Sequence, residues 1–356
     1  AATALLAQLI PCSTHRSRVV CELVLATDVW PPALRAIAHW RDRGAAGQVC
    51  TELLARLLSR AAFPSDDAIG SWGANELEDY LEFRENYLAE PIADLARQDP
   101  LAVYRAALAP FANASQPAAG VWQRREAALF TANAAAHVLL SRVLAPPPPP
   151  GQSDPDPHRA ELAEVIPHIL RASAMPPASC TASAAGEALL LLSRCRLVAS
   201  LAPWLAAHST ESCANDALDG IVMCLAHAAP ATAEAAVLSV SQLSNRCASQ
   251  LGASPARLDA LLTFLASPHA SISAAFRRGY VQSCARIVVS VAREQNDTAV
   301  LSRLFLPLLS SIDATLRALE SAGTSDASAI AAAAAAPAAA AGLADATGGA
   351  TLGDVL

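Results

Sequence analysis

The chain has 356 residues, and 53% of them are hydrophobic, which is enough for two globular domains or one elongated array. Only 4% of the residues are aromatic and 15 are glycine, a composition that argues against a β-sandwich or a β-barrel. The formal net charge is −7 and all 25 basic residues are arginine, with no basic face that could neutralise phosphates, so we do not expect a general nucleic-acid binder.

Apolar residues recur three and four positions apart along nearly the whole chain, which predicts helices, and strand-like alternation is almost absent. In the first part, the predicted helices cover residues 31–40, 47–62, a segment beginning at 75, and 122–144. Asn75 is the predicted N-cap of the third helix, with Glu78 three residues later as in a capping box. Pro91 is expected to kink or split that helix, since proline removes one backbone hydrogen bond.

A proline-rich segment interrupts the helices at residues 146–157. Five consecutive prolines are followed by a glycine and two further prolines, a composition that forms neither a helix nor a central strand. We expect an extended, solvated insertion at the surface. A docking site for a proline-recognition module is the alternative interpretation.

Helical periodicity resumes after this segment and stops near residue 322. The predicted helices of the second part cover residues 158–174, 183–201, 210–228, 232–250, 255–266, 271–293 and 297–321. The remaining residues are rich in alanine and glycine, so they cannot bury enough surface to offset the entropy of ordering. The expected organisation is helical repeats over 1–145, a proline-rich linker over 146–157, helical repeats continuing the same array over 158–322, and a disordered tail over 323–356.

Consecutive helices joined by short turns, with no sheet to cover, leave two architectures, a compact bundle and a solenoid of helix pairs. About a dozen helices exceed what one bundle core accommodates. Successive pairs also recur at about 40–50 residues, which is the range of HEAT and armadillo repeats. We therefore predict an all-α fold, an α-solenoid superhelix of antiparallel HEAT-like helix pairs.

Catalytic and metal-binding patterns are absent from the sequence. No HExxH, GxSxG or phosphate-loop motif occurs. His137 and His168 have no histidine or cysteine three or four positions away, which argues against a metal site. We expect no catalytic residue, no cofactor, no metal and no enzyme activity. A helical enzyme domain is the weakest of the alternatives.

The nine cysteines form no CxxC pair and lie mostly among apolar helical neighbours, as expected of free thiols in a reducing compartment. The longest uncharged runs, residues 106–123 and 327–344, are interrupted by proline, so no membrane span is predicted. The chain begins at Ala1 without a methionine, and we expect it to be a fragment.

Negative charge is concentrated in one segment. Between residues 76 and 94, seven carboxylates stand against one arginine, a net charge of −6. We interpret this segment as the solvated face of an amphipathic helix. The alternative is a contact with a basic partner, where the charge would speed association more than it deepens affinity.

The tightest basic clusters of the second part are two arginine pairs, Arg194 with Arg196 and Arg277 with Arg278. They are either polar edges of amphipathic helices or candidate partner-binding residues. In the second case they would meet an acidic or phosphorylated ligand, because the guanidinium fork suits carboxylate and phosphate.

Two motifs in the first part carry a family resemblance. The first, Asp79-Tyr80-x-Glu82-Phe83-Arg84, resembles the D-[FY]-x-E-F-R element of the transportin-SR and importin-13 branch of the β-karyopherins. The second, which runs from Trp122 through Glu126-Ala127 to Leu129-Phe130, resembles the W-x-x-x-E-A-x-L-F element of the same branch at the expected spacing. The resemblance extends from about residue 1 to 321. The proline-rich insertion has no counterpart in the family pattern.

The resemblance implies the central fragment of a HEAT-repeat receptor that carries cargo proteins through the nuclear pore, most simply in import, under control of the GTPase Ran. The implied partners are a cargo protein, Ran and nucleoporins, without direct contact to nucleic acid or membrane, and the receptor would shuttle between cytoplasm and nucleus. In the family, amino-terminal repeats bind Ran-GTP and a later arginine-rich helix grips phosphorylated Ser/Arg cargo. Neither segment is evident here, so no functional residue is transferred. The alternative function is a HEAT or armadillo scaffold that assembles a multiprotein complex.

Overall fold

The computed structural model describes residues 43–112, 120–146, 156, 158–174, 183–208, 211–266, 272–296 and 298–322. Every regular element in these ranges is a helix and no strand occurs among them, so the chain is all-α as predicted. The helix predicted over 31–40, most of the linker 146–157 and the tail 323–356 lie outside the described residues.

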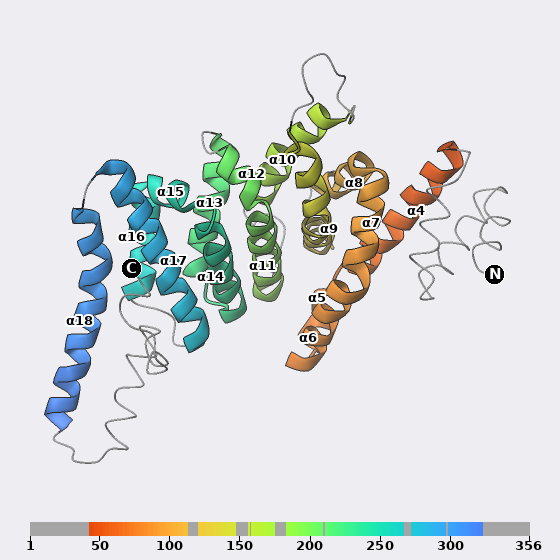
Figure 1. Cartoon of the computed structure of the whole chain (residues 1–356). Helices are drawn as coiled ribbons and strands as arrows, with labels where there is room; N and C mark the ends of the chain where they lie inside the picture. The colour runs from red at the N-terminus through yellow and green to blue at the C-terminus, as the bar shows by residue number, and fades with distance from the viewer. Residues whose placement is uncertain are drawn as a thin grey trace. The chain divides into compact units, whose positions relative to one another are not determined.

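The chain divides into two compact units, residues 1–193 and 194–356, and the division falls within helix α11 (Ala184–Ser200) (Figure 1). The first unit contains α4 (Arg43–Ala61), α5 (Asp66–Gly70), α6 (Ala74–Phe83), the π-helix η1 (Arg84–Leu88), α7 (Ala89–Gln98), α8 (Pro100–Ala112), α9 (Val121–Val143) and α10 (Arg159–Ala174). The second unit contains α12 (Ala202–Ala207), α13 (Ser212–Leu225), α14 (Pro230–Ser244), α15 (Ala248–Ala253), α16 (Pro255–Ala266), α17 (Ala274–Gln295) and α18 (Ala299–Ala322).

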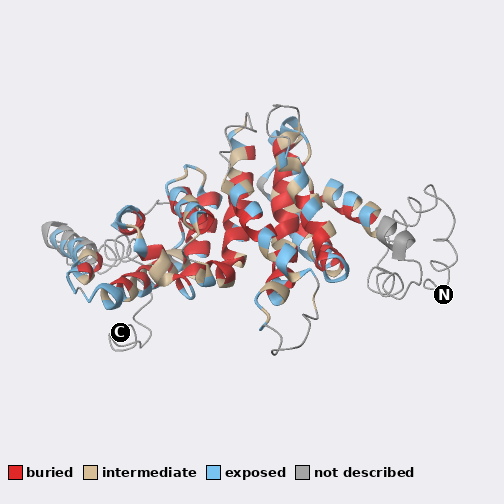
Figure 2. Cartoon of the chain, turned by 90° about the horizontal axis from the view of Figure 1, so that it is seen from above, coloured by how far each residue is buried: buried red, intermediate tan, exposed pale blue. Residues whose placement is uncertain are grey.

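Helix α9 forms the centre of the first unit. It packs against α4, α7, α8 and α10, and buried residues therefore follow it around most of its circumference (Figure 2). The small side chains of Ala127, Ala128, Ala132 and Ala135 are all buried, and they let neighbouring helices approach closely. This explains why the periodicity of α9 predicts a helix but defines no single apolar face.

Helices of the second unit stack in a repeating order. Helix α13 packs against α14 and α16 packs against α17, while α13 also contacts α16 and α14 contacts α17. Each helix pair thus lies on the next, with first helix on first helix and second on second, as in a solenoid of repeats. Helices α13 and α16 begin at Ser212 and Pro255, a repeat of 43 residues. This length lies in the range predicted from the sequence.

Two side-chain hydrogen bonds between neighbouring repeats, Arg257 to Asp219 and Arg105 to Glu161, span 38 and 56 residues, and six others span 42–45 residues. With their sequence separations, the six bonds run from Arg84 to Glu126 (42), from Arg142 to the carbonyl of Arg97 (45), from Ser239 to the carbonyl of Cys195 (44), from Cys247 to the carbonyl of Ala202 (45), from Ser283 to Ser241 (42) and from Arg303 to Asp259 (44). The register of neighbouring repeats is therefore held by polar contacts as well as by the apolar core.

The predicted N-cap at Asn75 is wrong. Helix α6 begins at Ala74, and its N-cap is Gly73, in an extended conformation with φ −78° and ψ 173°. The carboxylate of Glu76 accepts a hydrogen bond from the Gly73 N–H, so the acidic half of a capping box is present two residues earlier than predicted. Asn75 itself is exposed.

The helix was predicted to kink or split near Pro91, and in the structure it continues without interruption from Ala74 to Gln98 but changes its winding before the proline. A π-helical turn, η1, separates α6 from α7, and Pro91 lies in the first turn of α7. Proline lacks the N–H for one helical hydrogen bond and its ring crowds the preceding turn, and the wider π-helical turn lies directly before it. The wider turn of η1 also changes which side chains of this segment face inward, and Arg84 and Leu88 are the buried ones.

Candidate interaction surfaces

The two motifs that carry the family resemblance meet in the interior of the first unit. The Arg84 Nη2 donates hydrogen bonds to both carboxylate oxygens of Glu126, each at 2.9 Å. The hydroxyl of Ser193 donates to the same carboxylate. Arg84 is 2% exposed and Glu126 is 0% exposed. The last residue of the first motif and the central acid of the second therefore form one buried ion pair.

Aromatic rings enclose the guanidinium of Arg84. Its Cζ lies 4.2 Å from the ring centre of Phe130 and 4.7 Å from that of Phe63. The ring of Tyr80 lies further away, at 5.9 Å. A cation held over ring faces gains electrostatic attraction from them, which offsets part of the cost of removing the charge from water.

Tyr80 connects the first motif to the end of α4. Its hydroxyl donates to the backbone carbonyls of Arg60 and Ala62, at 2.9 and 2.8 Å. Burial raises the pKa of Tyr80 above its ordinary value, against the opposing effect of Arg84, so the phenol remains a donor at neutral pH. The tyrosine of the first motif therefore has a structural role, because it joins α6 to the end of α4.

The first two residues of the second motif form hydrogen bonds to α5 and to the residues just before it. The indole nitrogen of Trp122 donates to the carboxylate of Asp66 at 2.7 Å, and the Gln123 amide donates to the carbonyl of Pro64 at 3.2 Å. Trp122 also packs with Phe63 in a buried apolar cluster. Both motifs are thus explained by contacts within the first unit, and their buried side chains do not form a surface for a partner.

The exposed side of α6, η1 and α7 carries what we call the acidic face. Its exposed carboxylates are Glu76, Glu78, Asp79, Glu82, Glu85 and Glu90. Tyr87, on the same segment, is 64% exposed, and its ring stacks on Phe83 with ring centres 5.7 Å apart and planes inclined by 24°. An exposed tyrosine among carboxylates suits an arginine-rich partner, because the ring can stack on guanidinium groups while the carboxylates pair with them. Contact with a basic partner remains a prediction.

The structure separates the two members of the first arginine pair. Arg196 is exposed, whereas Arg194 is only 8% exposed. A Cβ at Gly220 would lie 1.7 Å from Nη2 of Arg194, so the guanidinium occupies the space that a side chain at residue 220 would fill. Arg194 is therefore not available to a ligand at the surface in this structure. A partner contact by Arg196 stays a prediction.

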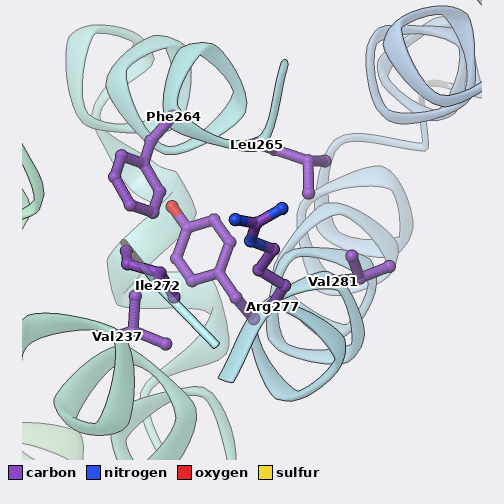
Figure 3. Close-up of a pocket in the computed structure, with 7 residues that line it drawn as sticks. Val237, Phe264, Leu265, Ile272, Arg277 and Val281 are labelled. Atoms are coloured by element: carbon purple, nitrogen blue, oxygen red, sulfur yellow. The ribbon is translucent and has the colours of Figure 1, made fainter. Parts of the chain in front are cut away.

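The second arginine pair lies at the start of α17. Arg278 is exposed, and Arg277 is half-buried beside a hollow whose walls are apolar. Figure 3 shows Arg277 reaching from α17 toward Leu265 of α16, with Phe264 on the other side of the hollow. The hollow, including space open to solvent, measures about 230 Å³. The space enclosed within it is only about 10 Å³, room for about one water molecule, so it is not a small-molecule pocket.

Arg257 is a buried polar residue that the sequence did not single out. It is 3% exposed, and its Nε donates to the carboxylate of Asp219 at 2.7 Å. Its other nitrogens donate to the carbonyl of Gln250 at 2.5 Å and to the side-chain oxygen of Asn215 at 3.2 Å. This arginine joins α13, α15 and α16. In the sequence, Arg257 and Arg194 each stand within an otherwise apolar helical stretch. A buried structural role for both arginines could have been predicted from that position.

Among the described residues, no group of three or more histidine, cysteine or carboxylate side chains is arranged to hold a metal ion. Within the same part of the chain, no helix combines the length and the apolar composition needed to cross a membrane.

The fold and its contacts define a class of protein, the all-α helical-repeat arrays. Within that class, the chain is similar to a solved structure described as "Importin13 cytosolic state", with a TM-score of 0.65 and 16% sequence identity. The similarity covers 89% of this chain and 36% of the other, so the chain spans about a third of the length of that protein. The fold is therefore karyopherin-like. Neither a protein-family profile nor a curated protein sequence matches the chain.

Proposed function

We propose that this chain is part of a nuclear transport receptor, a karyopherin that carries cargo proteins into the nucleus under control of the GTPase Ran. The observation that carries the proposal is the likeness in fold to importin 13 over 89% of the chain. The buried pair of Arg84 and Glu126 supports it independently, because these two residues belong to the two motifs that resemble the family. The proposed partners are a cargo protein, Ran and nucleoporins, and the proposed location is both cytoplasm and nucleus.

The contacts between repeats suggest how such a receptor would work without catalysis. Six side-chain hydrogen bonds between neighbouring repeats, each within one of the two units, span 42–45 residues. Small rotations at successive contacts therefore add up along an array of repeats. Cargo and Ran-GTP would bind different curvatures of the same receptor, so that binding of one shifts the population away from the form that holds the other.

The acidic face and Arg196, Arg277 and Arg278 are the proposed cargo contacts in this part of the receptor. The acidic face would meet basic cargo, and its net charge would raise the rate of encounter. These arginines would meet carboxylates or phosphates on an acidic or phosphorylated cargo.

The test is a pull-down of the full-length protein with Ran locked in its GTP form, with GDP-bound Ran as the matched control. We expect retention on Ran-GTP and not on Ran-GDP, and release of bound cargo when Ran-GTP is added. Cargo retained only together with Ran-GTP would reverse the proposed direction to export. If the full-length protein binds neither form and holds its partners regardless of nucleotide, the receptor proposal fails and a scaffold function replaces it.

A further inference from the structure

Helix α18 leaves several large apolar side chains exposed. The helix packs against α16 and α17, and its residues Val300 and Leu304 are buried. Phe305, Leu306 and Leu309, by contrast, are 44%, 61% and 58% exposed. Three such side chains close together on one helix are typical of a surface that another element covers.

The preceding repeat shows which element covers the equivalent surface there. Leu261 and Leu262 of α16 are both buried, and α17, the second helix of that pair, packs on α16. The hydroxyl of Tyr280 in α17 donates to the carbonyl of Leu261 at 2.9 Å. The equivalent residues of α18 lie 43 residues later, and there Leu304 is buried but Phe305 is exposed. The described part of the chain therefore holds the first helix of this repeat without the second.

The chain that follows α18 has the length and the position of such a second helix. Helix α18 ends at Ala322, and the uncharged run 327–344 begins after four intervening residues. Helix α14 likewise begins after four residues that follow the end of α13 at Leu225. The run has 18 residues, compared with 15 in α14 and 22 in α17. Residues 327–344, which lie outside the described residues, are therefore long enough for one second helix.

An alanine-rich helix suits this place because α18 supplies the large side chains. Helix α14 uses small residues in the same way, since Ala233, Ala235 and Ala236 are all buried in a helix that packs against α13 and α17. Alanine also has the highest helix propensity. Pro337 inside the run would bend the helix without excluding it, as Pro167 is accommodated inside α10. The tail is predicted to be disordered because it has few large side chains of its own to bury, and contact with α18 removes that objection.

We propose that residues 327–344 form a helix antiparallel to α18 that covers Phe305 and Leu309, with Leu306 at the edge of the contact. The contact is intramolecular, because a four-residue connection keeps the two segments together at a high effective concentration. The new helix completes the repeat of α18 as α17 completes the repeat of α16. This inference does not depend on the proposed transport function, since any array of helix pairs must cover the apolar side of each first helix.

Photo-cross-linking in the complete chain tests the contact. Phe305 is replaced by p-benzoylphenylalanine, the protein is irradiated and digested with trypsin, and linked peptides are identified by mass spectrometry. Cleavage after Arg303 and Arg317 places residue 305 and the run 327–344 on different peptides. The expected result is a link from residue 305 to a residue within 327–344. If the same probe at residue 305 and at Leu309 gives no such link in protein whose circular dichroism is unchanged, the proposal is overturned.

Two controls identify what covers α18. The same probe at Ser310, which is exposed and lies about 140° around the helix from Phe305, should give little linkage to the run. Equal linkage from both positions would show random contact and contradict the proposal. In a mixture of unlabelled and nitrogen-15-labelled protein, the links should join peptides of one isotopic form. Links between the two forms would assign this surface to a second copy of the chain instead.

Charged substitutions in the run test the apolar contact itself. Residues 333 and 335 lie about 200° apart on a helix, so one of them faces α18 in any rotation of the run. Ala333→Asp together with Ala335→Asp should lower the yield of the link at least about fivefold, because a carboxylate would be buried among apolar side chains. The matched control is Gly348→Asp with Gly349→Asp, which adds the same charge beyond the run and should leave the yield unchanged. Equal yields in the two double variants would overturn the proposal.

Discussion

Arg84 and Glu126 show how single residues can specify a fold without adding much to its stability. Removing two charges from water costs about as much as their attraction returns, so a buried ion pair contributes little net free energy. Any other register of η1 on α9, however, would leave both charges buried without a partner. We infer that this pair selects the register of the two repeats, with Ser193 and the rings of Phe63 and Phe130 completing the site.

Single and double substitutions distinguish this role from simple stabilisation. Glu126→Leu leaves the guanidinium of Arg84 buried without its carboxylate, and we expect it to lower the free energy of unfolding by about 3–5 kcal/mol. The double variant Arg84→Met with Glu126→Leu removes both charges from an apolar surrounding and should recover most of that loss. Urea denaturation of the four proteins of the cycle measures both quantities.

The control for this cycle is an exposed ion pair of the same unit. Arg97 pairs with Asp94 and its side chain is 50% exposed. Arg97→Ala should therefore change stability by only about 0–1 kcal/mol. A similarly small loss for Glu126→Leu would show that the buried pair does not specify the register.

At the scale of helices, the sequence predicts an element well where its start is marked locally. The helix predicted over 255–266 coincides with α16, because Pro255 opens it and the hydroxyl of Ser254 accepts from the N–H of Arg257. The long helix predicted over 122–144 likewise corresponds to α9. Capping groups and proline act within a few residues, so they are visible in one sequence.

Other helices depend on contacts that the local pattern does not show. The single helix predicted over 232–250 is two, α14 and α15, and the break lies next to Cys247, whose thiol donates to the carbonyl of Ala202 45 residues earlier. Helix α8 was not predicted because its alanine-rich sequence, in which Arg105 is the one charged residue, shows little contrast between polar and apolar positions. Asp99 nevertheless caps this helix by accepting from the N–H of Ala102. The pairing of Arg84 with Glu126 was not predicted either, because it is a contact between residues far apart in the sequence. A contact across 42 residues leaves no local periodicity.

The contact between α15 and α17 requires a glycine. A Cβ at Gly252 would lie 2.1 Å from Cγ2 of Val291 and 3.2 Å from Cγ2 of Ile287. We expect Gly252→Ala to lower the free energy of unfolding by about 1–3 kcal/mol through overpacking. Gly279→Ala, where the new methyl group makes only an ordinary contact, should instead be neutral or stabilise by up to about 1 kcal/mol through helix propensity. Thermal denaturation of the two variants, compared with the wild type, checks the prediction. Equal melting temperatures for both would contradict the close packing of α15 on α17.

For the whole molecule, the repeated spacing of 42–45 residues is the feature that unites the fold with the proposed function. Bonds of this spacing join neighbouring repeats within each unit, and a receptor whose curvature varies would need contacts of this kind between repeats. The HEAT-like repeat length was predicted from the lengths of the helices and of the turns between them. The hydrogen bonds that fix the register came only from the structure, since they depend on which faces meet.

Cross-linking Asp259 to Arg303 tests this register most directly. These residues form an exposed ion pair between α16 and α18, with side chains 62% and 40% exposed, so both tolerate substitution by cysteine. The variant with Asp259→Cys and Arg303→Cys should be joined by a short bismaleimide, as identified by mass spectrometry against the wild-type background. A control with Asp259→Cys and Asp313→Cys, whose second site lies about 15 Å further along α18, should not be joined. Linkage of the first variant alone is the predicted result. Linkage of the control instead, or of neither, would contradict the repeat register.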